Sequence, residues 1–345
     1  MGLTKDSKVK MTSKFTSGQL NLITDVPGVK VGQVTLEDDK KGIHTGVTAV
    51  LPHGGNLFKD KVMAAVSVIN GFGKSAGLVQ IEELGTIESP IMMTNTLSVG
   101  TVLDTTVKYM LEQNEEIGVT TGTVNCVVTE CNDGELNDIR GQHVKAEHVT
   151  AALNQASEIF EEGAVGAGTG MICMGLKGGI GSASRVIELD EQSYTIGALT
   201  LTNFGFAGNL RIDGRHIDTC TPANNTSAGD VEKGSVIILI GTDIPLNERQ
   251  LKRMAKRATI ALARTGSFCG NGSGDISIAF STANRVPHQS GNAILQTKML
   301  HDDRMDIVFE ATAEAVEEAI LSSLAHAKTV CGVRGKVVHA LNEYI

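Results

Sequence analysis

The sequence predicts a layered protein of mixed α and β structure, α/β or α+β, on three observations. Short runs of β-branched residues alternate with segments of helical periodicity along most of the chain. Hydrophobic residues make up 41% of the 345 residues, which is enough to fill a large buried core. The 39 glycines suit the turns and close backbone contacts that such layering needs.

Candidate strands are short apolar runs bounded by glycine or polar turns. The runs that fit are residues 62–69, 124–129, 194–202, 236–240 and 276–280. Because these runs are spread along the chain and helices separate several of them, sheet formation must bring distant segments together.

Three segments have the periodicity of an amphipathic helix, with apolar residues three or four positions apart. The first covers residues 147–162, and Gly163 supplies a C-terminal stop. The second is one helix through residues 251–262 that closes at Gly266. The third covers residues 308–327, with acidic residues toward its start, where the helix dipole favours them.

Charge and composition exclude several classes of partner. The net charge of −9 would repel nucleic-acid phosphates and anionic lipid, and only 3% of the residues are aromatic. No apolar run is long enough for a transmembrane helix. We therefore expect neither nucleic acid nor a membrane as a partner.

The cell compartment is indicated by the N-terminus and the cysteines. Residues 1–19 are basic and polar and lack the apolar stretch of a secretory signal, so we expect a flexible tail. The six cysteines are scattered without a C-x-x-C pair, which is typical of reduced thiols. Both features favour a cytoplasmic location.

One long polar segment interrupts the regular pattern. Residues 209–234 are rich in Asn, Thr, Asp and Gly, and they run directly into Ser235 and an apolar strand. Long loops inside compact domains are often functional, but a surface excursion before a strand explains the same composition. Both interpretations stay open on the loop alone.

Known chemical motifs mostly fail. Gly73–Gly77 matches the G-x-S-x-G nucleophile elbow, but no following acid and histidine stand in a distinctive context. A phosphate-binding loop there would need glycine in place of Val68. The glycines of residues 163–170 lack dinucleotide-binding spacing, and residues 130–135 lack the calcium-loop pattern. No metal ligand set and no cofactor are predicted.

An ordered set of longer stretches carries a resemblance to a known family. These stretches include ITDVPGV, GIHTGVT, NGFGKSAGLVQIEELGTIESPI, ECNDGELNDIRG, GAVGAGTGM, TLTNFG, KGSVIILIGTDIPL and ARTG followed by SGD. Together they resemble the DmpA-like L-aminopeptidase/D-esterase family, which also contains the β-peptidyl aminopeptidases. The resemblance covers nearly all of residues 20–330 and implies that the elbow-like segment is not catalytic.

The resemblance implies a fold and a processing event. The fold is a four-layer α/β/β/α sandwich, shared with the ornithine acetyltransferases rather than with conventional Ntn hydrolases. Residues 20–345 would form one catalytic domain, cleaved between Gly234 and Ser235 into an α chain of residues 1–234 and a β chain of residues 235–345. Family members assemble further, commonly as tetramers of such heterodimers.

The residue types at the expected cleavage point suit the chemistry. Glycine has no Cβ, so its carbonyl can be approached closely and its backbone can take unusual angles. The hydroxyl of Ser235 can attack that carbonyl. The freed α-amino group has an ordinary pKa of about 7.7–8.0, so it can act as the base for the same hydroxyl.

Further catalytic residues follow from the resemblance, position by position. Asn203 matches an asparagine that helps to hold the oxyanion, a role that suits a neutral amide donor. Ser273 matches a second serine beside the nucleophile, where it would hydrogen-bond the Ser235 hydroxyl or amine. Asp275 would orient that group and stabilise positive charge.

The same resemblance implies two substrate-binding residues. Glu130 matches a carboxylate that grips the free amino group of the substrate, which would explain exopeptidase behaviour. Asn132 replaces a tyrosine that assists the oxyanion in family members, and its amide has a shorter reach. This replacement bears on substrate preference and efficiency.

The expected activity is hydrolysis of the N-terminal residue from a small peptide, amide or ester through an acyl-enzyme. One rival is an acyltransferase of the same fold, although that group usually has threonine at the cleavage point. The other rival is an uncleaved, non-catalytic member that binds small amines or peptides.

Overall fold

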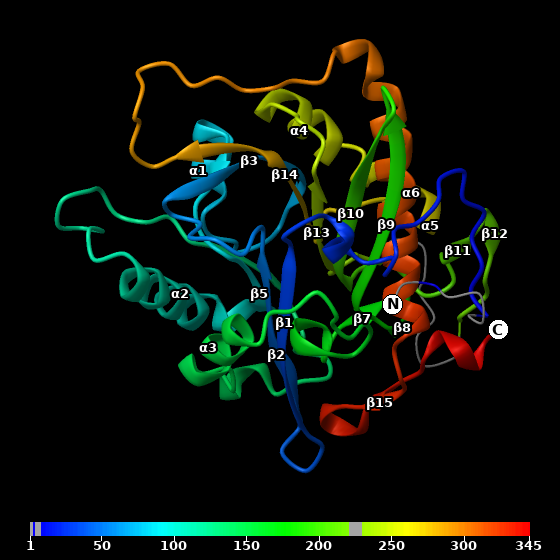
Figure 1. The fold of residues 1–345 in the computed structure, drawn as a ribbon. Coiled ribbons are helices and arrows are strands. Elements are labelled where there is room, and N and C mark those ends of the chain that lie inside the picture. Colours follow the sequence, from blue (N-terminus) through cyan, green and yellow to red (C-terminus); the bar gives the residue numbers. More distant parts are fainter. Residues whose placement is uncertain (1–2, 4–7, 221–229) are drawn as a thin grey trace.

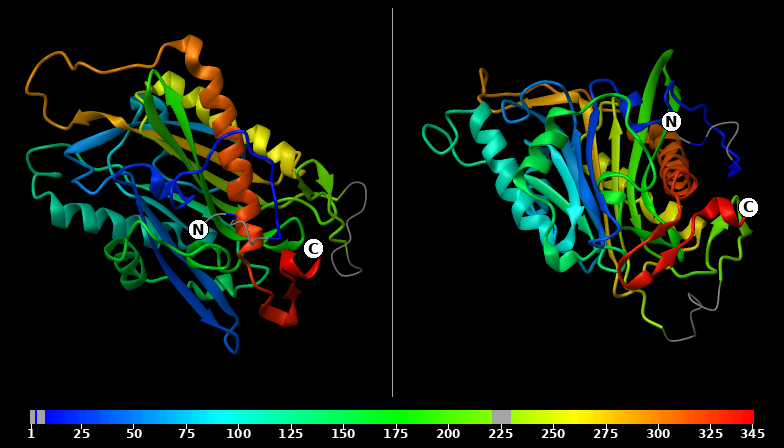
Figure 2. Two further views of the ribbon diagram at one scale, coloured as in Figure 1. Left: turned by 45° about the vertical axis from the view of Figure 1, so that its right-hand side comes forward. Right: turned by 90° about the horizontal axis from the view of Figure 1, so that it is seen from below.

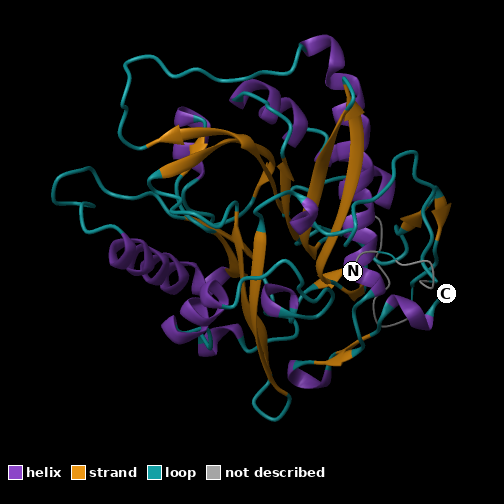
Figure 3. Ribbon diagram, in the orientation of Figure 1, coloured by secondary structure: helices purple, strands orange, loops and turns teal. Residues whose placement is uncertain are grey.

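The computed structural model describes residues 3, 8–220 and 230–345 (Figure 1). Two sheets lie face to face, and helices cover the outer side of each (Figures 1 and 3). Seen from below, helices, one sheet, the second sheet and further helices follow one another across the molecule (Figure 2). The predicted α/β/β/α sandwich is confirmed.

The smaller sheet has four strands in the order β1-β2-β5-β6. Its strands are β1 (Lys30–Asp38), β2 (Ile43–Leu51), β5 (Ile91–Asn95) and β6 (Val127–Cys131). β1 and β2 form an antiparallel hairpin, β5 pairs antiparallel with β2, and β6 pairs parallel with β5. Helices α2 (Val99–Gln113) and α3 (Ala146–Asn154) cover its outer face.

The larger sheet has six strands in the order β4-β3-β14-β13-β10-β9. Its strands are β4 (Thr86–Ile87), β3 (Asp60–Gly71), β14 (Gly274–Pro287), β13 (Ser235–Thr242), β10 (Gln192–Asn203) and β9 (Gly179–Leu189). Only the β13–β14 pair within this sheet is parallel. Helices α4 (Glu248–Ala255), α5 (Ala258–Thr265) and α6 (Met305–Ala325) pack on its outer face.

The remaining elements are short. Helix α1 (Leu78–Leu84) follows β3. Three two-stranded pairs are formed by β7 (Ile172–Cys173) with β8 (Leu176–Lys177), β11 (Arg211–Ile212) with β12 (Arg215–His216), and β15 (Val330–Cys331) with β16 (Val337–Val338). Single 3₁₀ turns lie at Ile23–Asp25, Thr96–Ser98, Ile139–Gly141, Gly166–Gly168, Asp302–Arg304, Val333–Gly335 and Leu341–Glu343.

Strand β13 shows why the layers stack. All of its residues are buried, as expected for a continuous apolar run covered on both faces. Ile237 and Leu239 join the core between the two sheets, while Val236, Ile238 and Ile240 join the core under the helices. Successive side chains of this strand point to opposite faces of the sheet, so one strand contributes to both cores.

Four of the five predicted strands lie within observed strands, and the run at 124–129 is shifted. The observed strand β6 begins only at Val127. Upstream of it, the backbone N–H of Asn125 donates to the Glu88 carboxylate at 2.8 Å instead of entering a sheet ladder.

The helix predicted over residues 147–162 is too long, because α3 ends at Asn154. Beyond it, the backbone of Ser157 exchanges hydrogen bonds with Val31 at 2.9 and 3.0 Å. Pairing with the edge strand β1 thus replaces the helix. Gly163 does have a left-handed φ of +90°, but there it pairs with Ile180 rather than ending a helix.

The single helix predicted over residues 251–262 is two helices, α4 and α5, with a break at residues 256–257. At the break, the Arg257 guanidinium lies 4.0 Å from the centre of the Phe309 ring. The stop at Gly266 is confirmed, with φ of +104°. The third predicted helix is confirmed as α6, which begins and ends slightly earlier than residues 308–327.

The two segments expected to be irregular are partly described. Within residues 209–234 the structure contains the β11–β12 hairpin, and residues 221–229 lie outside the described residues. Within the expected N-terminal tail, the backbone of Thr16 bridges to Val186, and the Lys14 N–H donates to the Glu314 carboxylate at 3.1 Å. Among the described residues, no helix has the length and apolarity to cross a membrane.

Candidate active site

The strand register brings the expected catalytic residues together at neighbouring ends of the central strands of the larger sheet. Ser235 is the first residue of β13, and it faces Asn203 at the end of β10. On its other side it faces Gly274 at the start of β14. Ser273 and Asp275 therefore flank the strand neighbour of Ser235, although they are distant from it in sequence.

Ser235 is buried and touches the other sheet. The residue is 5% exposed, and its side chain lies close enough to the thiol of Cys131, at the end of β6, to oppose the rise in the pKa of that thiol. The Cys131 sulfur also lies 3.7 Å from the Leu201 carbonyl oxygen. Burial raises the pKa of the thiol well above its usual value, so the group stays neutral beside the hydroxyl. Motif reasoning did not single out Cys131, although strand alternation from Glu130 would have turned it toward the other sheet.

Position 234 has room only for glycine, because no side chain fits there. A Cβ there would lie 2.7 Å from the Phe204 Cα and 2.8 Å from the Asn203 carbonyl oxygen. Its φ is not in the left-handed region, so the expectation of an unusual backbone angle is not met. The Gly234 carbonyl oxygen accepts a hydrogen bond from the Gly274 N–H at 3.2 Å.

Ser273 and Asp275 form a buried pair. The Ser273 hydroxyl donates to Oδ1 of Asp275 at 2.6 Å, and Oδ2 has no hydrogen-bond partner among the described residues. Burial raises the pKa of Asp275 to about 6, the hydrogen bond from Ser273 opposes this rise, and the charge of Glu232 adds to it. The carboxyl group therefore exchanges protons close to neutral pH.

Two residues that the sequence did not indicate hold the loop before β14. The Asn70 amide donates to the carbonyl oxygens of Gly270, at 2.8 Å, and of Ser273. The Glu232 carboxylate accepts the Gly270 N–H at 2.9 Å and the Gly205 N–H at 2.7 Å. Glu232 thus connects the segment before Ser235 to the loops on both sides of β13.

Asn203 is fixed by hydrogen bonds from two directions. Its side-chain oxygen accepts the Ile172 N–H at 2.9 Å, and its side-chain nitrogen donates to the Asn132 carbonyl oxygen at 3.0 Å. A side-chain amide has a second N–H, which these bonds leave available. The Asn132 side chain itself accepts the Gly134 N–H at 2.9 Å, so it closes a local turn.

A fully buried lysine supports the loop that carries Ile172. The Lys177 ammonium donates to the carbonyl oxygens of Gly168, Met171 and Gly178 at 3.0, 2.8 and 2.7 Å. Burial lowers the pKa of Lys177 to about 7. No spacing rule marks this lysine in the sequence, because its partners are backbone groups.

Glu130 lines a cavity of about 340 Å³ together with Ser235. Its carboxylate accepts the Lys74 N–H at 3.0 Å and a hydrogen bond from the Thr96 hydroxyl. The elbow-like segment therefore contributes a backbone donor to the wall. The cavity is lined by Phe72, Lys74, Thr96, Glu130, Asn132, Val231, Lys233, Gly234, Ser235, Asn271 and Gly272.

A second cavity of about 850 Å³ adjoins the first and shares Asn132, Val231, Lys233 and Gly234 with it. Its other walls include Phe204. Among the residues that the structure describes, no histidine lines either cavity. The Gly234–Ser235 bond thus lies where the two cavities meet, and acidic residues line both of them. A buried serine after a glycine carbonyl, with a neighbouring acid and amide, fits acyl chemistry in which the base is not histidine.

This fold and this site fit one class of protein, the serine aminopeptidases. Comparison with known proteins agrees. The profile of peptidase family S58 matches residues 21–338, and the chain belongs to this family. A curated relative, the beta-peptidyl aminopeptidase BapA of Sphingosinicella microcystinivorans, is 41% identical over 94% of this chain and 86% of its own.

Solved structures share the fold. The PH0078 protein from Pyrococcus horikoshii OT3 is 52% identical, with a TM-score of 0.89 over 97% of this chain and 94% of its own. The L-aminopeptidase D-Ala-esterase/amidase of Ochrobactrum anthropi is 37% identical, with a TM-score of 0.87 over 96% and 93%. The latter is described as a prototype serine aminopeptidase and a new variant of the Ntn hydrolase fold. The present chain is accordingly a peptide-bond hydrolase of the serine aminopeptidase type.

Proposed function

We propose that Ser235 is the nucleophile of this aminopeptidase and that the chain cleaves itself at the Gly234–Ser235 bond. The Ser235 oxygen attacks the Gly234 carbonyl carbon, the C–N bond breaks, and the hydroxyl proton passes to the departing nitrogen. Water then hydrolyses the resulting ester. The products are an α chain that ends at Gly234 and a β chain with Ser235 as its free N-terminus.

The observation that carries this proposal is the position of the scissile group. The Ser235 hydroxyl is buried next to its own preceding carbonyl, and the Gly274 N–H already donates to that carbonyl oxygen. A donor placed on the oxygen stabilises the negative charge that develops during attack. Gly234 supports the proposal because any side chain there would meet the backbone of β10.

In the mature enzyme the new α-amino group would act as the base for the Ser235 hydroxyl. The free oxygen of Asp275 is suited to hold the ammonium form, while Ser273 fixes the other oxygen of that carboxylate. Asn203 would contribute its second N–H to the oxyanion. Asn132 would assist only through a shorter amide, since its side-chain oxygen already closes a turn.

The proposed substrates are small peptides, amides or esters with a free amino group. Glu130 is buried in the cavity beside Ser235, and its charge would pair with the substrate ammonium. The acyl part then occupies this cavity, and the leaving group faces the larger one. The names of the relatives favour peptides that begin with an L- or β-amino acid, and one name adds esters and amides of D-Ala.

We further propose a cytoplasmic enzyme that assembles as a tetramer of αβ heterodimers. Exposed apolar side chains directly after β3 and on α1 support an assembly surface, since Phe72, Val79 and Leu84 are each more than half exposed. Light scattering coupled to gel filtration tests the stoichiometry. A monomeric heterodimer at micromolar concentration would contradict the tetramer.

Denaturing electrophoresis and intact mass of the purified protein test the cleavage. The wild type should give two fragments that meet at residues 234 and 235, and Ser235→Ala should give one full-length chain. Amino-acid p-nitroanilides should be hydrolysed by the wild type only. A full-length, inactive wild type would contradict the proposal and favour a binding protein, whereas transfer to added amines without hydrolysis would favour an acyltransferase.

A further inference from the structure

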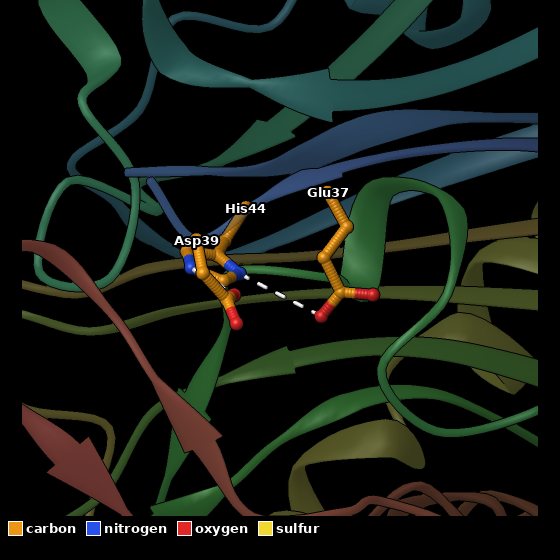
Figure 4. Close-up of side chains that lie close together, drawn as sticks. All are labelled: Glu37, Asp39 and His44. Atoms are coloured by element: carbon orange, nitrogen blue, oxygen red, sulfur yellow. Dashed lines mark ion pairs between the residues drawn. The ribbon is translucent and has the colours of Figure 1, made fainter. Parts of the chain in front are cut away.

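A second cluster of chemically active side chains lies where the β1–β2 hairpin turns. Glu37 and His44 are opposite each other in the strand register, and Asp39 follows in the turn (Figure 4). Glu37 Oε1 lies 3.8 Å from Nδ1 of His44, and Asp39 Oδ1 lies 3.5 Å from Nε2. Each residue offers one ligand atom, and these atoms all lie within 4.8 Å of one another. None of the three lines either cavity beside Ser235.

His44 is the unusual member of this cluster. Its side chain is fully buried, and neither ring nitrogen has a hydrogen-bond partner among the described residues. Buried polar atoms are normally hydrogen-bonded, so two unsatisfied ring nitrogens that face carboxylates need an explanation. The backbone N–H of His44 donates to the Asn137 side chain at 3.1 Å, which fixes the residue in place.

No protein cation among the described residues neutralises the two carboxylates. Lys41 pairs with Asp38 at 3.3 Å, and no lysine or arginine in the described part of the chain lies within ion-pair distance of Glu37 or Asp39. Lys177 is close enough for the charge of Glu37 to act on it, but its ammonium is occupied by three carbonyl oxygens. The negative charge at the hairpin turn is therefore left for another cation.

We propose that Glu37, Asp39 and one ring nitrogen of His44 bind a divalent metal ion of the zinc class. Imidazole nitrogen and carboxylate oxygen are both zinc ligands, at bond lengths of about 2.0–2.2 Å, and three protein ligands leave a fourth position for water. Tetrahedral bonds of that length place the ligand atoms about 3.3 Å apart, so the present ligand atoms, which all lie within 4.8 Å of one another, must draw together by up to about 1.5 Å. The two carboxylates are more than half exposed, so they can rotate onto an ion that reaches the buried imidazole from solvent.

The bound ion would be structural. It would tie the hairpin turn to β2, and it takes no part in the reaction of Ser235, so this inference does not rest on the proposed function. The sequence does not reveal the site, because the pattern E-x-D-x₄-H becomes a ligand set only through the hairpin register.

Calorimetric titration of the chelator-treated full chain with zinc chloride tests the site. The wild type should bind one equivalent with a raised melting temperature, and Co²⁺ in place of zinc should show visible d–d absorption. The double variant Glu37→Gln/Asp39→Asn should bind at least tenfold more weakly and lose the Co²⁺ bands. Because both substituted side chains are exposed, this variant should fold and keep its peptidase activity.

A matched control is the double variant Glu188→Gln/Asp190→Asn, which removes an acidic pair of the same spacing from the β9–β10 hairpin. It should bind zinc as the wild type does. The proposal is overturned if the wild type shows no saturable binding, or if the Glu37/Asp39 variant keeps wild-type affinity. Equal weakening in both double variants would also overturn it, because that result reflects net charge rather than a site.

Discussion

The Ser273 hydroxyl donates to one oxygen of Asp275 at 2.6 Å, and the other oxygen of this carboxylate is buried without a partner in the described part of the chain. A half-satisfied buried carboxylate destabilises the folded state when it is ionised. The same unsatisfied oxygen is available for a positively charged amine. The ionised form of Asp275 therefore lowers stability, while the same ionised form is the one that can bind an amine.

In the uncleaved chain that carries Ser235→Ala, the further change Asp275→Asn should increase stability above neutral pH. Burial raises the pKa of Asp275 from 3.8 to about 6, so the folded chain binds this proton more tightly than the unfolded chain does. The free energy of unfolding of the uncleaved chain with Asp275 consequently falls as pH rises from about 4 to about 6, and the loss is complete above that window. Removing the charge should raise the free energy of unfolding by about 2 kcal/mol at pH 7.5 and by nothing at pH 4.

Urea unfolding at the two pH values measures this difference. Asp302→Asn is the control, because its hydrogen bonds with Arg249 and Gln250 lower the pKa of Asp302 to about 2, and this variant should gain nothing at pH 7.5. An equal gain for Asp275→Asn at both pH values would contradict the assigned pKa. Self-cleavage of Asp275→Asn should be slower despite its greater stability.

Gly234→Ala should slow self-cleavage strongly. The added Cβ would meet backbone atoms of Phe204 and Asn203, which cannot move aside as a flexible side chain would. The scissile carbonyl must then shift relative to Ser235, and a displacement of about 1 Å can cost about a hundredfold in rate. The half-life of the full-length band after synthesis measures the effect. Gly291→Ala, with open space around its Cβ, should cleave at the wild-type rate.

Glu130→Gln should raise the KM for substrates with a free amino group. The amide keeps an oxygen for the Lys74 N–H but loses the charge that pairs with the substrate ammonium. Hydrogen bonds to charged groups exceed neutral ones by about 1 kcal/mol or more, so KM should rise about tenfold while kcat changes less. Glu112→Gln on the exposed face of α2 should leave both constants unchanged. A fall in kcat with unchanged KM would contradict a role in gripping the amine.

The sequence predicts the parts of this molecule that depend on local pattern. The apolar run after Ser235 is a buried strand, and Gly266 ends a helix as its position predicts. The expected helix over residues 147–162 fails where tertiary pairing of Ser157 with Val31 competes with helical periodicity. Local propensity is a weak guide wherever an edge strand offers partners.

The candidate site shows a similar division. Resemblance to a family indicates Ser235, Asn203, Ser273, Asp275 and Glu130. The register places Ser235, Asn203 and Asp275 on neighbouring strands, with Ser273 directly before β14. Four residues that support them, Cys131, Asn70, Glu232 and Lys177, were not singled out by any motif or resemblance. Each of them acts on backbone groups or across the two sheets, and such contacts follow from the packed fold rather than from spacing along the chain.

Cys131→Ala tests whether contact between the sheets positions the nucleophile. The Cys131 thiol is buried, belongs to the opposite sheet and lies beside Ser235, where its sulfur can accept a weak hydrogen bond from the hydroxyl. Losing one such bond costs about 1 kcal/mol, so self-cleavage should slow about fivefold to tenfold. Cys126→Ala is the matched control, because burial also raises the pKa of this thiol, to about 12, while its hydroxyl neighbour is Ser89 rather than Ser235. Both variants should lose a similar amount of stability, about 1 kcal/mol for the deleted buried group, as thermal unfolding would show. Only Cys131→Ala should slow cleavage, and equal cleavage rates in the two variants would mean that the thiol serves packing alone.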